Sequence, residues 1–82
     1  MTITVAQPAS DYASSHVDLY INGHRLAVLG KDSEVHLKME PGLHEVMAVC
    51  GMYKASFVCN RSERLKITWR LNPPAMVIER MK

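Results

Sequence analysis

Four histidines and two cysteines are the residues of this sequence that could carry chemistry. The histidines are His16, His24, His36 and His44, with gaps of eight, twelve and eight residues between them. A zinc site needs three or four converging ligands, which commonly occur in pairs a few residues apart. The spacing argues against such a site, so we expect no metal and no other cofactor.

The two cysteines, Cys50 and Cys59, could act as nucleophiles or form a disulfide. A reactive thiolate needs a neighbouring cation, a histidine or a helix N-terminus, and no segment has the periodicity of a helix. Two cysteines are also too few for a disulfide framework, so we expect both to be free and partly buried. The sequence has no glycine-rich phosphate loop and no serine-centred elbow. We therefore expect a protein that is not an enzyme.

The histidine at position 44 follows a Pro-Gly in the stretch LKMEPGLHEV. The flanking apolar residues sort to one face if Met39 pairs with His44 in an antiparallel hairpin. Lys38 then lies opposite Glu45, which is a favourable cross-strand pair. This register predicts a hairpin with its loop at residues 40–43 and makes His44 a hydrogen-bonded structural residue at the edge of the core.

Another hairpin is predicted before this stretch, where apolar and polar residues alternate from Val17 to Ile21. Asn22-Gly23 supplies the two positive-φ residues of a type I′ turn, a strong hairpin signal. A two-residue loop pairs Ile21 with His24. Continued without a break, the same register pairs Leu19 with Leu26 and Val17 with Val28.

Further strands are expected at residues 53–59 and 64–71, and an edge strand at residues 75–81. Prolines at 73 and 74 separate the last two, since proline cannot donate to a ladder. The total is about six or seven short strands, typical of a small antiparallel sandwich or barrel. The expected core consists of Val17, Leu19, Ile21, Leu26, Val28, Val35, Leu37, Val46, Phe57, Leu65, Ile67 and Trp69.

The 82 residues suffice for one domain, and a domain of this size has little room for an internal active site. Residues 1–15 are rich in Ala, Ser and Thr and are predicted to form a flexible arm. Residues 16–82 are predicted to form the β-sandwich domain. No apolar run approaches the roughly 18 residues of a membrane span, and the N-terminus does not resemble a signal peptide. We therefore expect a cytoplasmic protein without membrane contact.

A basic stripe is the sharpest surface feature, and it consists of Arg64, Lys66, Thr68 and Arg70 on the outward side of one strand. Alternate strand residues lie ~7 Å apart, a spacing similar to that of successive phosphates. Lys54 on the preceding strand is predicted to extend the stripe. With a net charge of only +2, the stripe fits a solvated face, an acidic protein partner or single-stranded nucleic acid.

Met47 and Val49 are predicted to lie on the outer face of their strand. Methionine adapts well to irregular contact surfaces. Either the apolar tail at residues 76–81 covers this pair within the chain, or the pair belongs to an interface, including that of a homodimer formed by strand addition.

Several short motifs follow one another between residues 17 and 71, namely Ile21-Asn22-Gly23, Pro41-Gly42, His44, Val46, Val49, Gly51 and Tyr53. Through these residues the sequence resembles a PEGA-type domain over about residues 17–71. The resemblance implies an immunoglobulin-like β-sandwich that has no catalytic residues and serves in binding or spacing. We therefore expect a non-enzymatic module that binds an acidic or apolar protein surface. The alternative is single-stranded nucleic-acid binding through Arg64, Lys66 and Arg70.

Overall fold

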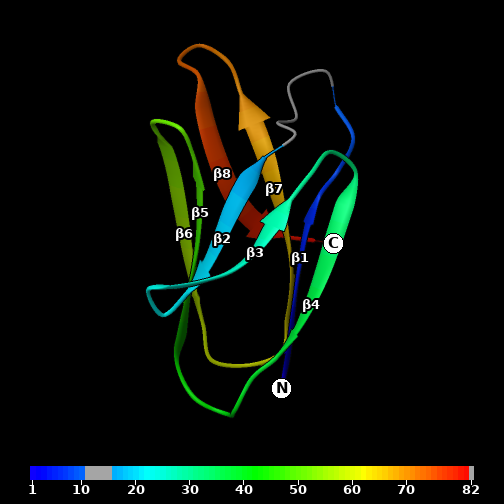
Figure 1. The fold of residues 1–82 in the computed structure, drawn as a ribbon, viewed down its shortest axis with the longest axis vertical. Coiled ribbons are helices and arrows are strands. Elements are labelled where there is room, and N and C mark those ends of the chain that lie inside the picture. The colour runs from blue at the N-terminus through cyan, green and yellow to red at the C-terminus, as the bar shows by residue number, and fades with distance from the viewer. Residues whose placement is uncertain (11–15, 82) are drawn as a thin grey trace.

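The computed structural model describes residues 1–10 and 16–81, which form eight strands in two packed sheets and no helix (Figure 1). Sheet 1 has the strand order β4-β1-β7-β8, and sheet 2 has the order β3-β2-β5-β6. The all-β prediction is confirmed, with eight strands in place of six or seven. The strands are β1 (Thr2–Gln7), β2 (Val17–Ile21), β3 (His24–Leu29), β4 (Ser33–Lys38), β5 (His44–Cys50), β6 (Tyr53–Cys59), β7 (Glu63–Arg70) and β8 (Ala75–Arg80).

The core lies between the two sheets and is filled by every second residue of their strands. This follows from the period of two in a strand, which sends alternate side chains to opposite faces. Leu65 and Ile67 of β7 are fully buried, and Trp69 is half-buried against them, as the alternation predicts. The other buried apolar residues are Ile3, Val5, Ala6, Val17, Leu19, Ile21, Leu29, Val46, Ala48, Cys59, Met76 and Ile78.

Strand β1 lies in the interior of sheet 1, antiparallel to β4 and parallel to β7 (Figure 1). Ile3 and Val5 are fully buried. The side chain of Gln7 is also buried, and it donates to the carbonyl of Gly30 (2.8 Å) and accepts from Trp69 Nε1 (3.0 Å). The prediction of a flexible arm is therefore wrong for residues 2–7, because β1 is ordered by partners far away in the chain. Residues 11–15 of that arm lie outside the described residues.

The hairpin of β2 and β3 has the predicted Asn22-Gly23 turn, and both residues have positive φ (51° and 83°). Its register shifts beside Leu19, which pairs with Ala27. The shift is a β-bulge, in which one strand carries an extra residue and the alternation of faces moves by one. Leu26 and Val28 are consequently exposed, so their assignment to the core is wrong.

The predicted hairpin at residues 35–48 does not form. Strand β4 pairs with β1 in sheet 1, whereas β5 pairs with β2 and β6 in sheet 2. Lys38 therefore lies opposite Thr2, and Glu45 lies opposite Val58. Alternation had sorted the apolar residues to one face correctly, but it does not specify the partner strand, and a type II Pro-Gly turn is not one that hairpins favour.

Residues 39–43 and 60–62 instead cross between the sheets, and both crossings lie at the end of the molecule where the N-terminus lies (Figure 1). Strand β8 is an edge strand, as predicted. It lies near β6, where the guanidinium of Arg80 sits 5.0 Å from the centre of the Phe57 ring. Among the described residues there is no helix that could cross a membrane.

Candidate interaction surfaces

The predicted binding residues lie on the outer faces of two different sheets. Arg64, Lys66 and Arg70 belong to β7 of sheet 1, whereas Met47, Val49 and Lys54 belong to β5 and β6 of sheet 2. Lys54 pairs with Val49 and cannot extend the basic stripe. That part of the prediction is wrong, because consecutive strands were assumed to be neighbours in one sheet.

The basic stripe on β7 is partly neutralised by Glu79 of β8. Glu79 pairs with Lys66 in the ladder, and its carboxylate lies 4.0 Å from Lys66 Nζ and 3.8 Å from Arg70 Nη2. Thr68 Oγ1 donates a hydrogen bond to the same carboxylate (3.2 Å). Three of the four stripe residues thus share one acidic partner, which the sequence could not reveal without the pairing of β7 with β8.

The outer face of sheet 2 is apolar at its centre. Tyr20 pairs with Met47 there, and Val49 lies in the next row. Val28 and Val58 lie on the two edge strands, one row to either side of Met47, and Leu26 lies at the bulge of β3. Each of the three exposes between 42% and 54% of its surface. The C-terminal strand does not cover this face, because β8 belongs to sheet 1. The expectation that the tail shields Met47 and Val49 is therefore wrong.

Charged residues also lie on this face. Asp18 lies between Val28 and Val49 in one row, and its Oδ1 is 3.2 Å from Arg25 Nε and 3.3 Å from His16 Nε2. No well-aligned hydrogen bond reaches Asp18 Oδ1 in the part of the chain that the structure describes. The aromatic ring of Tyr53, by contrast, points inward and meets Trp69 edge to face at 5.5 Å, which removes it from any stacking surface.

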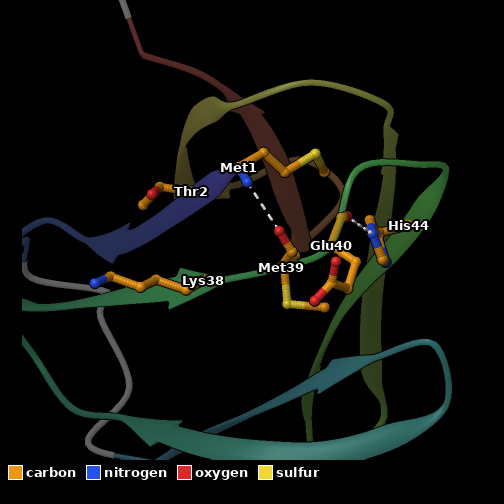
Figure 2. A pocket seen from close by; sticks show the side chains of 6 residues that line it. All are labelled: Met1, Thr2, Lys38, Met39, Glu40 and His44. Carbon is orange, nitrogen blue, oxygen red and sulfur yellow. Dashed lines mark hydrogen bonds between the residues drawn. The ribbon is translucent and has the colours of Figure 1, made fainter.

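A hollow of about 430 Å³ opens at the end of the molecule beside the crossing at residues 39–43. Figure 2 shows that Glu40 and His44 lie on one side of it and Thr2 and Lys38 on the other. The N-terminal ammonium of Met1 donates to the carbonyl of Met39 (2.8 Å) at its wall.

His44, at the rim of this hollow, is held through both ring nitrogens. Asn22 Oδ1 accepts from the backbone N–H of Glu45 (2.9 Å), which turns the Asn22 amide nitrogen toward His44 Nδ1 (2.8 Å). Nδ1 must then accept, and Nε2–H donates to the carbonyl of Glu40 (2.7 Å). One neutral tautomer satisfies all three bonds. The predicted hydrogen bonding of His44 is confirmed.

Both cysteines lie in the described part of the chain, and they form no disulfide there. They lie at opposite ends of the β5–β6 hairpin, where Cys50 pairs with Tyr53 and Cys59 pairs with His44. Burial raises the pKa of the Cys59 thiol, the charge of Glu63 adds to this effect, and the charge of nearby Arg80 opposes it. A thiol with a raised pKa is a poor nucleophile at neutral pH.

Glu63 is a buried carboxylate that the sequence analysis missed. It accepts hydrogen bonds from Arg80 Nε (2.8 Å) and Arg61 Nε (3.1 Å). Burial alone would raise the pKa of Glu63, but these two hydrogen bonds and the two positive charges outweigh burial and lower it. The pair of arginines thus keeps a charge at the inner face of sheet 1, because β7 begins at Glu63, one residue earlier than the strand predicted at residues 64–71.

Metal ligands do not gather in this fold: within residues 1–10 and 16–81, no three His, Cys, Asp or Glu side chains lie close enough to hold an ion. Comparison with family models, with curated proteins and with solved structures finds no match to this chain. A functional proposal for this chain must therefore be argued from the geometry of the two outer faces.

Proposed function

We propose that this chain is a non-enzymatic protein-interaction module whose contact surface is the outer face of sheet 2. The observation that carries the proposal is the position of the exposed apolar residues Leu26 (52% exposed), Val28 (42%) and Val58 (54%). Val28 and Val58 lie one row to either side of the Tyr20–Met47 pair, in rows that also hold Asp18 and Glu45. Exposed apolar residues that gather on one face with a polar rim are typical of an interaction site.

The other large apolar residues that are exposed in the described ranges do not form such a group. Leu43, Met52 and Leu71 each lie in a turn between strands. Single exposed apolar residues are normal on protein surfaces. The contrast supports an apolar partner surface for sheet 2 rather than a general excess of apolar residues.

A role without catalysis is supported by the state of the residues that could do chemistry. Both nitrogens of His44 are engaged in structural hydrogen bonds. Cys59 is buried, and its pKa is raised. The cytoplasm is the compartment that we propose, because Cys50 and Cys59 lie at opposite ends of one hairpin without a disulfide, as is usual in a reducing compartment.

We further propose that the two sheets form an immunoglobulin-like sandwich of the PEGA type. Support comes from the residues of the resemblance, since Asn22 and His44 are 22 positions apart in the chain and yet share a hydrogen bond. The Asn-Gly turn and the Pro-Gly-x-His segment are therefore connected by hydrogen bonds in one network. Such a network would explain why the two short motifs occur in the same chain.

Nucleic-acid binding through Arg64, Lys66 and Arg70 is the less supported alternative. A strand of phosphates needs a continuous row of cations, because affinity comes from the number of phosphates neutralised. Glu79 interrupts the row by taking Lys66 and Arg70 as its partners.

Affinity capture with the full chain, followed by mass spectrometry, tests the proposal. We expect the wild type and a Leu43→Lys control to capture the same proteins, since Leu43 lies in a turn and is 71% exposed. Met47→Lys should lose them, because an ammonium in the centre of the apolar face must be desolvated on binding. Where Met47→Lys melts at a lower temperature than the wild type, Val58→Lys serves as the second variant. Capture by both face variants at the level of the wild type would refute the proposal.

Self-association is measured on the same proteins by analytical ultracentrifugation. A wild type that dimerises beside a monomeric Met47→Lys identifies a second copy of the chain as the partner on this face. If the wild type is monomeric, the partner on this face is the protein identified by affinity capture and not a second copy of the chain.

A further inference from the structure

The residues beside Arg64 form a small group of donors that lies across sheet 1 and not along β7. Strand β1 runs between β4 and β7, so Thr2 has Lys38 on one side and Ser62 on the other. One row further, Thr4 has His36 on one side and Arg64 on the other. Lys38 and Arg64 are 26 positions apart in the sequence, and only the insertion of β1 makes them neighbours on one face.

Lys38 and Arg64 differ from the other basic residues of sheet 1 in their partners. Lys66 and Arg70 lie near Glu79, and His36 is 2.9 Å from Glu34. Neither Lys38 nor Arg64 makes an ion pair with any residue in the part of the chain that the structure describes. Figure 2 shows the Lys38 side chain pointing away from the carboxylate of Glu40.

Two hydroxyl groups lie beside these two basic residues, Thr2 next to Lys38 and Ser62 two residues before Arg64. Thr2 is exposed, and its backbone N–H donates to Ser62 Oγ at 2.9 Å. Ser62 Oγ accepts this bond and keeps its own proton for another acceptor. Arginine, lysine, serine and threonine side chains are the usual donors to phosphate oxygens.

The spacing of the group suits a single tetrahedral anion. Neighbouring strands are about 4.8 Å apart and successive outward residues about 7 Å apart, so the Cα atoms of Lys38 and Arg64 are separated by roughly 12 Å. Both side chains are long enough to reach a point above Thr2. A dianion there would meet an ammonium, a guanidinium and two hydroxyls, and charge-assisted bonds of this kind are the strong ones.

We propose that Lys38, Thr2, Ser62 and Arg64 form a binding site for a phosphate-type dianion, either free phosphate or a phosphate monoester. The site is independent of the apolar face of sheet 2, because it lies on the outer face of the other sheet. Glu79 and Glu34 define its limits by engaging the cations on either side. It accepts one phosphate group and not a continuous chain of them.

An NMR titration of the full chain with inorganic phosphate tests this site, against sodium chloride at equal ionic strength. We expect saturable amide shifts centred on Thr2, Lys38, Ser62 and Arg64. Arg64→Gln and Lys38→Gln should each weaken phosphate binding at least about tenfold, which is 1.4 kcal/mol. Arg70→Gln is the matched control, since it removes an equal charge whose partner is Glu79, and it should change the affinity less than about threefold.

Equal shifts in sodium chloride would overturn the proposal, as would an equal loss of affinity in Arg64→Gln and Arg70→Gln, which would indicate a general attraction of anions. A second arm uses a single-stranded oligonucleotide without terminal phosphates, and we expect it to bind more weakly than phosphate. Tighter binding of the oligonucleotide, lost equally in Arg64→Gln and Arg70→Gln, would replace the monoester site with a nucleic-acid surface.

Discussion

The outer face of sheet 1 is charged, and several of its basic side chains lie near an acidic one. The outer face of sheet 2 exposes apolar side chains near Tyr20 and Met47. On sheet 1, Glu79 lies near Lys66 and Arg70. On sheet 2, exposed Val28 and Val58 lie on the two edge strands. The same strand geometry thus produces two surfaces, for which we propose a small anion on sheet 1 and an apolar partner on sheet 2.

The comparison depends first on β1, because this strand brings β4 and β7 into one sheet. We expect Ile3→Ala to destabilise the protein by about 2–5 kcal/mol, since it removes a fully buried side chain and leaves a cavity. Leu43→Ala is the control, and a change at this exposed position should stay within about 0.5 kcal/mol. Urea unfolding measures both. Equal stability of the two variants would mean that residues 2–7 are not part of the core, and the anion site would lose its basis.

A second difference between the sheets is the buried charge of sheet 1 at Glu63. Its pKa is lowered, so its contribution to stability is present above the unfolded value of about 4.5 and is lost as the pH falls through the lowered folded value. Glu63→Gln should therefore reduce stability at pH 7 by about 1.5–3 kcal/mol, the range for hydrogen bonds to charged groups. The difference from the wild type should shrink below pH 4.

Urea unfolding at pH 7 and at pH 3 measures this effect, with Glu40→Gln as a control at an exposed carboxylate. A destabilisation by Glu63→Gln that is the same at both pH values would contradict an ionised Glu63 in the fold. Sheet 1 would then not differ from sheet 2 in holding a buried, ionised carboxylate.

At one end of sheet 2, hydrogen bonds of the His44 side chain connect neighbouring segments. In sheet 1 the corresponding buried group is the ionised Glu63. His44→Ala removes two hydrogen bonds at a half-buried position, so we expect a loss of roughly 1–2 kcal/mol. His24→Ala is the matched control, because His24 is an exposed histidine of the same sheet, and it should be nearly neutral. Thermal unfolding compares the two variants. Similar melting temperatures for both would show that the network around Asn22 contributes little.

The parts of this fold that sequence patterns predicted are those with local causes. Asn22-Gly23 specifies its turn because both residues tolerate positive φ. The alternation at Leu65, Ile67 and Trp69 specifies the inner face of β7 because the period of a strand is two. His44 was predicted correctly to be hydrogen-bonded, although the strand predicted to pair with its own strand was the wrong one.

The parts that could not be predicted depend on pairing between distant strands. Strand β1 carries only a short apolar alternation, and its parallel neighbour β7 begins about 60 residues later. A bulge at Leu19 moved Leu26 to the surface without any break in the apolar pattern. The candidate sites changed for the same reason, since Glu79 beside Lys66 and Lys38 near Arg64 are consequences of sheet order.

The most direct test of the two-face account is protein capture by two variants side by side, Met47→Lys for sheet 2 and Arg64→Glu with Arg70→Glu for sheet 1. We predict that the sheet 1 double variant captures the same proteins as the wild type and that Met47→Lys does not. Circular dichroism and melting temperature confirm that each variant is folded before capture. Loss of the captured proteins by the double variant, with retention by Met47→Lys, would contradict the account and assign the protein contact to the basic face.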